Sequence, residues 1–314
     1  MNKKYLVTGG MGLIGSNLSN RLKGDVTVVS RSKKNADRIK RKVKVIIKSI
    51  DQLTKADIKD IDIVYHCAST VDNYNILTDP YLDVRTNIEG TIHLLELIKN
   101  LKKKPKIVYL STFFVYGHEY DRSRKPLTEE SPTEPLSLYP ATKLAAENVI
   151  KIYSRLYGIP YVIFRLTNVY GAEEQYGNKR KGALNFLIME ALKGNDLTIY
   201  DGGNFIRDYI YVDDVARAII RGSREKNQTY LVGYGKSIAF SKLISIIHKE
   251  TDGRSKVVAI PIPDFHKAVG INNMAVNTKK IRSLGWKPKV TFEEGAKKII
   301  TRYRSLLRYS HGKI

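Results

Sequence analysis

The first two-thirds of the chain alternate short runs of apolar, mostly β-branched residues with longer segments of helical periodicity. The apolar runs lie at Tyr5–Val7, Val26–Val29, Val43–Ile47, Ile61–His66, Lys106–Leu110 and Tyr161–Arg165. Helical patterns lie between them at Leu13–Leu22, Thr86–Asn100 and Ala141–Tyr157. Strands that are apolar on both faces and separated by helix-length segments indicate βαβ units and a parallel sheet covered on both sides. We therefore predict an α/β fold with a doubly wound parallel sheet and right-handed crossovers.

The alternation becomes irregular after Tyr170. The polar, glycine-bracketed stretch 171–181 is typical of a loop, and it is followed by a helical pattern at 184–193 and a short strand at 197–200. The runs Tyr209–Val212 and Tyr230–Val232 are predicted to rejoin the main sheet. We expect one domain from residues 1–170 plus about 206–236, and a smaller, discontinuous α/β domain from about 171–205 plus 237–314.

The composition limits the class of protein. A chain of 314 residues with 42% hydrophobic residues can bury a sizeable core and is not a disordered polypeptide. A total of 54 Lys and Arg against 31 Asp and Glu gives a net charge of +23, which first suggests a polyanionic partner such as nucleic acid or an anionic membrane. The single cysteine excludes a disulfide framework and fits a reducing compartment. Neither a signal peptide nor a transmembrane run is found, so we expect a cytoplasmic protein.

Three glycines follow the first predicted strand at intervals of three residues. Gly9, Gly12 and Gly15 belong to the sequence Thr-Gly-Gly-Met-Gly-Leu-Ile-Gly, which opens a helical pattern. Glycine permits a tight turn and a close approach of the backbone to a pyrophosphate, and the helix N-terminus offers free N–H groups to the anion. A glycine triplet alone is a weak signal, but between a strand and a helix it predicts a Rossmann dinucleotide site.

The end of the second predicted strand bears on the choice of cofactor. NAD sites place an acidic residue there for the ribose 2′-hydroxyl, whereas NADP sites prefer a cation for the 2′-phosphate. This chain has Ser30, Arg31 and Ser32 and no acid, which favours NADP(H) over NAD(H), although a solvated basic turn has the same sequence. Asp51, after the third strand, is either an acceptor for the adenine amino group or a helix cap.

A tyrosine and a lysine four residues apart begin a helical pattern at Tyr139 and Lys143, and they share one helix face. A free tyrosine has a pKa of about 10 and is a poor base at neutral pH. A neighbouring ammonium in a dry cleft favours the phenolate. Ser111 and Thr112 directly follow the predicted central strand Lys106–Leu110, at the carboxyl end where α/β sheets place their ligands. The six histidines show no metal-ligand spacing, so no metal site is expected.

Seven segments in order along the chain resemble the extended short-chain dehydrogenase/reductases of the nucleotide-sugar epimerase/dehydratase family. The segments are Thr8–Gly15, His66–Ser69, Asn87–Thr91, Ser111–Gly117, Tyr139–Lys143, Arg165–Gly171 and Arg207–Asp214. The resemblance covers essentially the whole chain. It implies an NAD(P)-binding first domain, a sugar-nucleotide-binding second domain and a homodimer formed through the helices at 86–100 and 141–157.

The resemblance also assigns roles to individual residues. It implies that Thr112 hydrogen-bonds the reacting sugar oxygen, that Tyr139 is the general base and acid, and that Lys143 tunes the tyrosine and holds the nicotinamide ribose. The full set of implied cofactor-binding residues is Gly9, Gly12, Leu13, Ile14, Gly15, Ser30, Arg31, Ser32, Asp51, Ala68, Asn87, Tyr139 and Lys143. The implied reaction is redox chemistry at C4 of a nucleoside-diphosphate sugar, with a 4-epimerase as the first expectation and a 4-ketoreductase or 4-dehydrogenase as the alternative.

Departures from the family pattern narrow this expectation. Dehydratases and decarboxylases of the family carry a carboxylate just after the hydroxyl residue, whereas this chain has Phe113 and Phe114, which cannot transfer protons. We therefore expect neither dehydration nor decarboxylation.

The implied substrate-binding residues are spread over both predicted domains. They are Thr112, Phe113, Asn168, Asn185, Tyr200, Arg207 and Lys267. Arg207 is the expected clamp on the diphosphate, because a guanidinium pairs with two phosphate oxygens; a surface ion pair with Asp208 is the alternative. Lys267 and Gly270 stand where the family has an arginine and an aspartate, so the nucleotide is expected to differ from the commonest uridine or thymidine diphosphates.

The excess charge leaves two other hypotheses. A nucleic-acid-binding protein on a dehydrogenase scaffold has no need of Thr112, Tyr139 and Lys143, and their presence argues against it. A basic tail at Arg302–Ile314 docked on anionic lipid would be a surface attachment, and no stable membrane insertion is expected.

Overall fold

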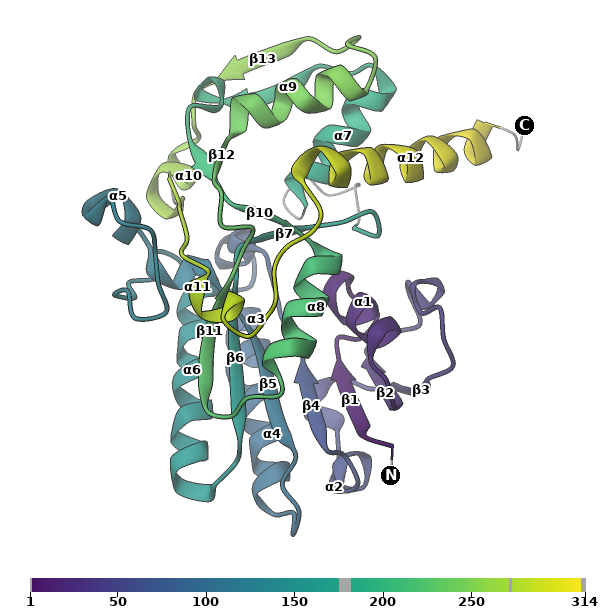
Figure 1. Ribbon diagram of the computed structural model, residues 1–314, viewed down its shortest axis with the longest axis vertical. Coiled ribbons are helices and arrows are strands. Elements are labelled where there is room, and N and C mark those ends of the chain that lie inside the picture. Colours follow the sequence, from purple (N-terminus) through teal and green to yellow (C-terminus); the bar gives the residue numbers. More distant parts are fainter. Residues whose placement is uncertain (1, 175–181, 271–272, 312–314) are drawn as a thin grey trace.

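The computed structural model describes residues 2–174, 182–270 and 273–311. Its main sheet has seven strands in the order β11-β6-β5-β4-β1-β2-β3, and every pair is parallel (Figure 1). The strands are β1 (Lys4–Thr8), β2 (Asp25–Ser30), β3 (Lys44–Ile47), β4 (Ile63–His66), β5 (Lys106–Thr112), β6 (Tyr161–Leu166) and β11 (Gln228–Val232). The order changes direction between β1 and β4, and such a switch point opens a ligand crevice at the carboxyl ends of the strands. The predicted doubly wound parallel sheet is confirmed.

Helices cover both faces of this sheet. On one face, α1 and α8 pack over a core that contains Leu18, Val28 and Val215. On the other face, α4 and α6 pack over a core that contains Leu95, Tyr109 and Ile150. The helices of this half are α1 (Leu13–Arg21), α2 (Lys55–Ile58), α3 (Tyr81–Asp83), a π-helix (Val84–Glu89), α4 (Gly90–Lys99), α5 (Glu119–Ser123), α6 (Leu138–Tyr157) and α8 (Val212–Gly222).

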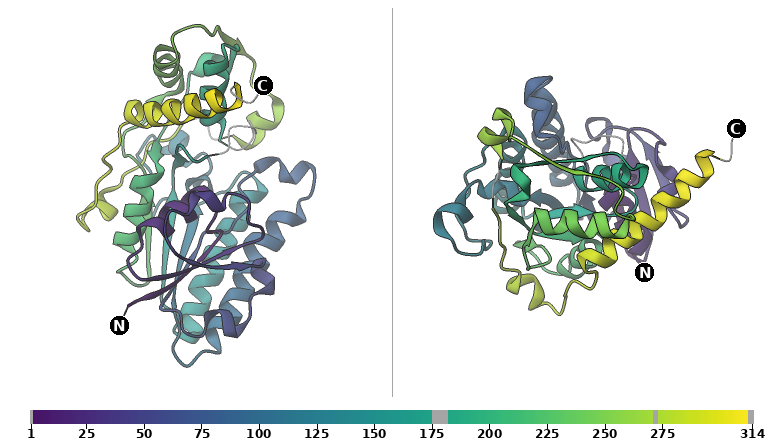
Figure 2. Two further views of the ribbon diagram at one scale, coloured as in Figure 1. Left: turned by 90° about the vertical axis from the view of Figure 1, so that its right-hand side faces the viewer. Right: turned by 90° about the horizontal axis from the view of Figure 1, so that it is seen from above.

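A second unit lies beyond the carboxyl ends of the strands and has its own core, around Leu187, Leu243 and Ile299 (Figure 2). It pairs β8 (Leu197–Tyr200) with β13 (Val257–Ile260) and β9 (Ile206–Arg207) with β12 (Ile238–Ala239). Its helices are α7 (Ala183–Lys193), α9 (Phe240–Glu250), α10 (Asp264–Val269) and α12 (Phe292–His311).

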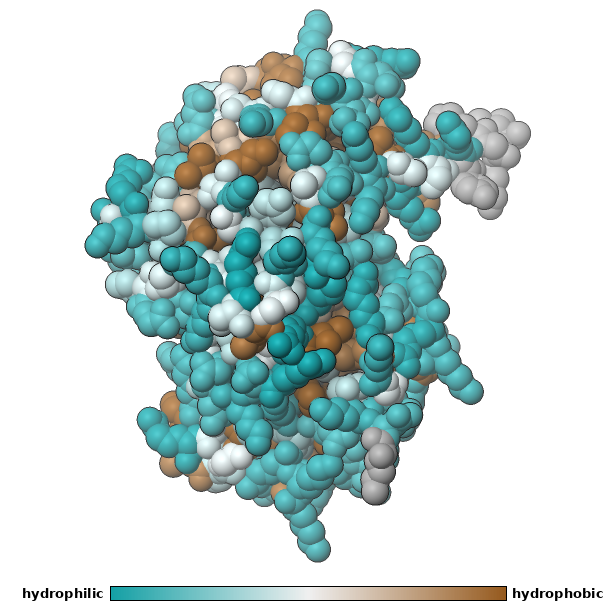
Figure 3. Space-filling model, viewed as in Figure 1, coloured by the Kyte–Doolittle hydropathy of each residue, from teal (hydrophilic) through white to brown (hydrophobic). Residues whose placement is uncertain are grey.

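The face seen in Figure 3 is mostly hydrophilic, and its apolar areas gather over this unit. Among the described residues, no helix is both long enough and apolar enough to cross a membrane.

One strand prediction was wrong. Tyr230–Val232 lies in the main sheet as expected, but Tyr209–Tyr211 (β10) pairs with Asn168–Tyr170 (β7) in a separate two-stranded sheet. The chain leaves the main sheet at Thr167, and the backbone N–H of Asn168 donates to the carbonyl oxygen of Asp208 at 3.3 Å. The β10 sequence is apolar enough for a central strand, but the pairing with β7 places it at the boundary between the two units.

Candidate active site

The glycine-rich turn between β1 and α1 cannot accept side chains at two of its glycines. Gly9 has a φ of +63°, and a Cβ there would lie 2.8 Å from the backbone of Ala68. A Cβ on Gly15 would lie 2.4 Å from the carbonyl oxygen of Gly9. Helix α1 begins directly after Gly12, and within the described structure no side chain caps its N-terminus and no acidic residue occupies its first turn. These features fit a dinucleotide pyrophosphate, because the turn leaves backbone donors free for an anion.

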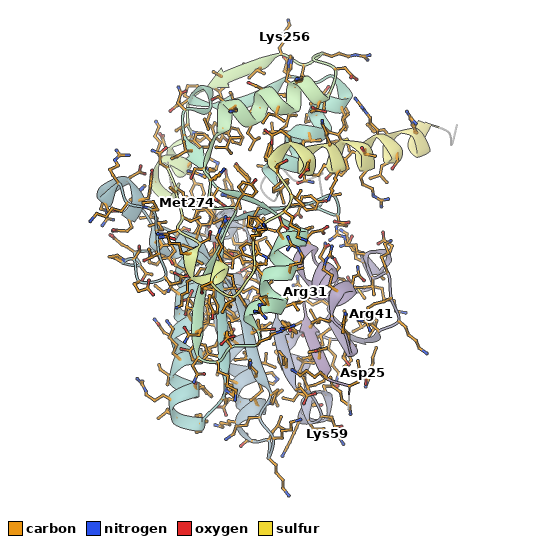
Figure 4. The ribbon with its side chains drawn as sticks, in the orientation of Figure 1. Asp25, Arg31, Arg41, Lys59, Lys256 and Met274 are labelled. Carbon is orange, nitrogen blue, oxygen red and sulfur yellow. The ribbon has the colours of Figure 1, made fainter. Side chains whose placement is uncertain are left out.

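A cavity of about 660 Å³ opens beside this turn, and it is large enough for a nucleotide. Seven of the predicted cofactor residues line it: Gly9, Gly12, Ser30, Arg31, Ser32, Asp51 and Ala68. Arg31 directly follows β2, and it is one of the residues labelled in Figure 4. The cavity wall also includes Lys34, Arg85 and Glu89, which the sequence analysis did not identify. Lys34 stands in the same basic turn as Arg31 and could have been found there.

Asp51 lies on the wall of this cavity. It belongs to a short 3₁₀ turn, Ile50–Gln52, whose cap is Ser49, with the Gln52 side chain accepting from the Ser49 backbone N–H at 3.0 Å. Asp51 is therefore not the helix cap, and its exposed carboxylate remains available to the cavity.

The other predicted cofactor residues lie around the cavity rather than on its wall. Gly15 is buried beneath the turn, while Leu13 and Ile14 pack against the second core. Asn87 is buried, and its side-chain amide accepts from Ser69 at 2.9 Å and donates to Thr142 at 3.0 Å. Asn87 therefore links the loop after β4 to helix α6, and its contacts position both.

Thr112, Tyr139 and Lys143 meet at the carboxyl end of β5. Thr112 is the last residue of β5, and Tyr139 and Lys143 lie one turn apart at the start of α6. All three side chains are buried, and Thr112 hydrogen-bonds Tyr139. The Lys143 ammonium lies over the ring of Tyr109, 4.1 Å from its centroid. The predicted constellation is thus assembled in one place.

The electrostatics of this group are those of a dry site. Burial raises the pKa of the Tyr139 hydroxyl, the hydrogen bond with Thr112 lowers it, and the charge of Asp83 raises it further. Burial also lowers the pKa of Lys143 to about 7, against the opposing charges of Glu147 and Cys67. A tyrosine in such surroundings needs a nearby cation to ionise at neutral pH, and Lys143 is placed to supply it.

The two phenylalanines after Thr112 differ in their surroundings. Phe113 is buried in a small core with Val115 and Tyr116, whereas Phe114 packs at the edge of that core and remains partly exposed. The two rings stack with centroids 4.2 Å apart. The structure therefore does not bring Phe113 to the site, and its neighbour Phe114 is the more accessible ring.

On the substrate side, Arg207 and Asn168 lie at the boundary between the two units. The Arg207 guanidinium lies over the ring of Phe205, 4.8 Å from its centroid, and burial lowers the pKa of Arg207. The Asn168 amide donates to the backbone oxygen of Asp208 at 2.9 Å. The Asp208 carboxylate accepts from Thr167 and from the backbone N–H groups of Tyr234 and Gly235. Asp208 thus serves a loop, and the surface ion pair with Arg207 is not the role that the structure gives it.

The structure places two predicted substrate residues away from the others. Asn185 is fully buried in the second core, where its amide donates to Gly171 at 2.8 Å and to Tyr303 at 2.7 Å. The Lys267 side chain is 61% exposed and pairs with Asp264. Lys267 therefore points to solvent, and helix α10 turns a different residue toward Tyr200.

That residue is His266, which belongs to an aromatic cluster that the sequence analysis did not identify. The cluster consists of Tyr74, Tyr200, Phe265 and His266. The Tyr74 hydroxyl hydrogen-bonds the His266 ring, and the Tyr74 ring stacks on Phe265 with centroids 4.7 Å apart. The ring centroids of Tyr200 and His266 are 5.1 Å apart. The cluster joins the loop after β4 to α10 and β8, and it contains the predicted residue Tyr200.

Fold and site together define a doubly wound α/β protein that has a glycine-rich turn suited to a dinucleotide and a buried tyrosine–lysine pair at the carboxyl end of the sheet. Residues 5–233 match the family described as "NAD dependent epimerase/dehydratase family", and the chain belongs to that family. Among the described residues, no group of three or more His, Cys, Asp or Glu side chains could hold a metal ion.

Relatives and solved structures agree with this family. The chain is 34% identical to a protein of Methanocaldococcus jannaschii named as a UDP-glucose 4-epimerase, over 94% of this chain and 96% of that protein. It is 29% identical to a dTDP-glucose 4,6-dehydratase of Escherichia coli, over 96% and 92% of the two chains. The crystal structure of UDP-glucose 4-epimerase with UDP-glucose from Thermotoga maritima is similar with a TM-score of 0.87 and 27% identity, over 97% of this chain and 99% of that one.

Proposed function

We propose that this protein is a 4-epimerase of a nucleoside-diphosphate sugar. The observation that carries the proposal is the buried group of Thr112, Tyr139 and Lys143 at the carboxyl end of β5, in the same sheet whose β1–α1 turn borders the cavity. The similarity to proteins named as UDP-glucose 4-epimerases supports the same activity.

In this proposal the chain's own residues orient the sugar and handle one proton. Thr112 holds the C4 oxygen by a hydrogen bond, and Tyr139 accepts the proton of the C4 hydroxyl and later returns it to the ketone oxygen. Lys143 stabilises the phenolate of Tyr139 while the proton is away from it. The glycine turn, the α1 N-terminus and the walls of the cavity would hold the dinucleotide. When bound, the nicotinamide supplies the hydride chemistry at C4.

The residues after Thr112 favour epimerisation over water loss or decarboxylation. Dehydration across C5 and C6 needs a group that takes a proton from carbon, and Phe113 and Phe114 have none to offer. The relatives include a dTDP-glucose 4,6-dehydratase, so the family alone does not decide this question. The proposal rests on the side chains at positions 113 and 114.

The cofactor is proposed to be NADP(H), with NAD(H) as the alternative that the family description names. Ser30, Arg31 and Ser32 line the cavity at the end of β2, and Lys34 adds a second cation to the same wall. A 2′-phosphate would find donors there, and no carboxylate at the end of β2 would repel it. The same observation favours a second candidate, a 4-ketoreductase or 4-dehydrogenase that binds and releases NADP(H) in each cycle.

The substrate is proposed to lie between Tyr139 and Tyr200. Arg207 is the proposed diphosphate clamp, and Asn168 lies on β7, which pairs with the strand β10 that begins two residues after Arg207. The aromatic cluster would contact the nucleoside, with His266 taking the place proposed for Lys267. The domain boundaries are proposed as from the sequence with one change. The segment around Trp286, which the sequence analysis put in the second domain, is assigned to the first, because Trp286 packs into the core of the main sheet.

A homodimer is proposed through α4 and α6. On α6, Ile152, Leu156 and Tyr157 are exposed by 41%, 65% and 39%, and together they leave an apolar stripe near the end of the helix. An apolar stripe of this kind needs a covering surface. Analytical ultracentrifugation of the wild type and of Leu156→Glu would test it, with a monomeric wild type contradicting the proposal.

The activity is tested with a panel of nucleoside-diphosphate sugars, which includes UDP-glucose, UDP-N-acetylglucosamine, UDP-glucuronic acid and the dTDP and GDP analogues, followed by NMR of the sugar. An epimerase converts a substrate to its C4 epimer without consuming added cofactor, and denatured protein releases bound dinucleotide. A protein that purifies without dinucleotide and oxidises NADPH in the presence of a 4-keto sugar is a reductase instead. Chromatography of the released nucleotide distinguishes NADP from NAD.

A further inference from the structure

A buried acidic residue lies close to the active site and has no part in the proposed reaction. Glu147 is 0% exposed and stands on α6, one turn after Lys143 and two turns after Tyr139. Burying a charge is costly unless the charge is paired and hydrogen-bonded. Glu147 is therefore the third ionisable residue on the face of α6 that carries Tyr139 and Lys143. The contacts of its carboxylate indicate its role.

Glu147 is held by side chains from two neighbouring strands. From β6, Arg165 donates through Nη2 to Oε2 at 2.8 Å and through Nε to both carboxylate oxygens at 3.1 and 3.2 Å. From β5, the Ser111 hydroxyl donates to Oε1 at 2.5 Å. Ser111 directly precedes Thr112, so the carboxylate fixes the end of the strand that carries the sugar-binding hydroxyl. Arginine stays protonated in proteins, and this pair is consequently a permanent feature of the site.

The arginine itself is fixed by two further acceptors. Its Nη1 donates to the Tyr116 hydroxyl at 3.0 Å and to the backbone oxygen of Glu129 at 3.1 Å. Among the influences on Lys143, burial lowers its pKa and the charge of Glu147 is the foremost one that raises it. The carboxylate stands one helical turn after Lys143 on the same buried face of α6, and Arg165 holds it there.

We propose that Glu147 is a positioning residue of this site: its carboxylate, held by Arg165 and Ser111, keeps Lys143 in the ammonium form beside Tyr139. The proposal rests on the proposed function only for the role of Tyr139 as base. Without Glu147, the lysine loses the charge that offsets its burial, and it becomes neutral at a lower pH. A neutral Lys143 no longer stabilises the phenolate of Tyr139.

Other ionisable groups face this pair from each packed element, and the test must take them into account. The groups around Lys143 are Tyr109 on β5, His66 and Cys67 at the end of β4, and Tyr139 and Glu147 on α6. The groups around Glu147 are Arg165 and Tyr161 on β6, Tyr109 on β5, Tyr116 after β5, and Lys151 one turn further along α6. Among these groups, Glu147 is the acidic residue that is fully buried, and its partner Arg165 is a buried cation.

The first test compares Glu147→Gln with Glu147→Asp in a pH profile of kcat/KM. The Gln variant keeps the shape and removes the charge, so the alkaline limb of the profile, where Lys143 loses its proton, should move by about one unit to lower pH. Activity at pH 8 should then fall about tenfold, with little change at pH 6. The Asp variant keeps the charge and should keep the position of the limb, although the shorter side chain lowers activity at every pH. An equal loss for the Gln variant at every pH would overturn the proposal.

A second measurement does not depend on the substrate or on the reaction. With ¹³Cε-labelled lysine, the Lys143 resonance can be assigned by its loss in Lys143→Arg and titrated directly. We expect its midpoint to fall in Glu147→Gln and to stay near the wild-type value in Lys151→Gln, which removes a half-exposed charge from the same helix. An unchanged midpoint in Glu147→Gln overturns the proposal even in an active enzyme. A shifted midpoint in a protein that epimerises no sugar supports the role of Glu147 and refutes the proposed function instead.

The Gln variant leaves Arg165 without its acidic partner, which threatens folding. The double variant Glu147→Gln/Arg165→Met removes both charges of the pair and replaces the guanidinium with an apolar side chain of similar length. Its Lys143 midpoint should also lie below that of the wild type. A midpoint at or above the wild-type value in the double variant contradicts the proposal.

Discussion

The cofactor side and the substrate side of this site are built in different ways. On the cofactor side, backbone groups of a glycine turn and buried side chains from neighbouring strands form a wall whose parts touch one another closely, since a Cβ on Gly15 would lie only 2.4 Å from the carbonyl oxygen of Gly9. On the substrate side, the aromatic cluster joins Tyr74 to His266 across 192 residues of sequence, through contacts between a loop and a short helix. The comparison suggests that the first side is rigid and intolerant of change, and that the second is adjustable.

The largest expected effect concerns the residue that serves both sides. Tyr139→Phe removes the hydroxyl that accepts the proton and leaves the packing of α6 unchanged, so kcat should fall by about 10²- to 10⁴-fold while the dinucleotide is still bound. Sugar NMR measures the turnover, and the nucleotide released on denaturation measures the cofactor. Turnover retained in this variant would refute the assignment of Tyr139.

The intolerance of the cofactor side can be measured with two glycines of the same backbone conformation. Gly9 and Gly158 have φ values of +63° and +66°, but a Cβ at Gly9 meets Ala68 whereas a Cβ at Gly158 meets no described atom within 4 Å. Each Gly→Ala variant should lose about 1–2 kcal/mol of unfolding free energy to the left-handed backbone. Gly9→Ala should lose about 1–3 kcal/mol more to overpacking, and its dinucleotide with it. Urea unfolding measures both free energies. An equal loss in Gly9→Ala and Gly158→Ala would contradict the close packing of the glycine turn against Ala68.

A buried histidine on the cofactor side, His66, makes folding stability depend on pH. His66 bonds Thr8 at 2.8 Å and Thr91 at 3.1 Å, and burial followed by the charge of Lys143 lowers the pKa of His66 to about 3. The unfolded chain binds a proton near its ordinary value, so folding stability should fall as the pH drops from about 6.5 towards 3, by about 2 kcal/mol between pH 7 and 5. His66→Gln should be less stable at pH 7 but should lose this part of the dependence. In His118→Gln, at a half-exposed histidine, the slope should stay as in the wild type; a wild-type slope in His66→Gln as well would contradict the prediction.

The sequence predicted the cofactor side of the site better than the substrate side. The positions of Gly9, Gly15, Tyr139 and Lys143 relative to their strands and helices are local, because each motif spans a few residues and its spacing carries the geometry. The Tyr74–His266 contact has no local signature, since the two residues meet only when the chain closes on itself. Lys267 and His266 are adjacent on a short helix, where each step turns the side chain by about 100°, so the sequence alone does not decide which of the two faces Tyr200.

A substitution at Arg31, on the wall of the cavity, tests the choice of cofactor. Its expected effect on binding is smaller than the effects above. Arg31→Ser removes the cation proposed for the 2′-phosphate, and the Kd for NADP should rise about tenfold while that for NAD changes little, because a charge-assisted hydrogen bond contributes about 1.5–3 kcal/mol at most. Titration with both cofactors measures the ratio. In Arg41→Ser, which removes another cation of the same basic region that donates to Gly24 at 2.8 Å, both constants should stay as they are. An unchanged ratio in Arg31→Ser would favour NAD as the natural cofactor.

The smallest expected effect lies on the substrate side and concerns the hydroxyl of Tyr74. Tyr74→Phe keeps the ring that stacks on Phe265 and removes the hydrogen bond to His266, a change that costs about 1 kcal/mol or less when the partner can turn to water. Burial lowers the pKa of His266, so its ring is neutral at pH 7.5 and the loss should not depend on pH near that value. We expect a two- to fivefold higher KM for the nucleotide sugar, or about 0.4–1 kcal/mol, with kcat and cofactor binding unchanged.

The matched control for this last prediction is Tyr81→Phe, at a tyrosine that is 68% exposed on the same side of the loop after β4 and outside the cluster. Both kinetic constants should stay at their wild-type values in that variant. A fall in kcat without a change in KM for Tyr74→Phe would mean that the cluster acts on the chemical step, as the cofactor side does. The substrate side would then also act on the position of Tyr139. One path for this effect runs through the Asn73 side chain in the loop after β4, which accepts from Ser137 at the start of α6 at 3.0 Å.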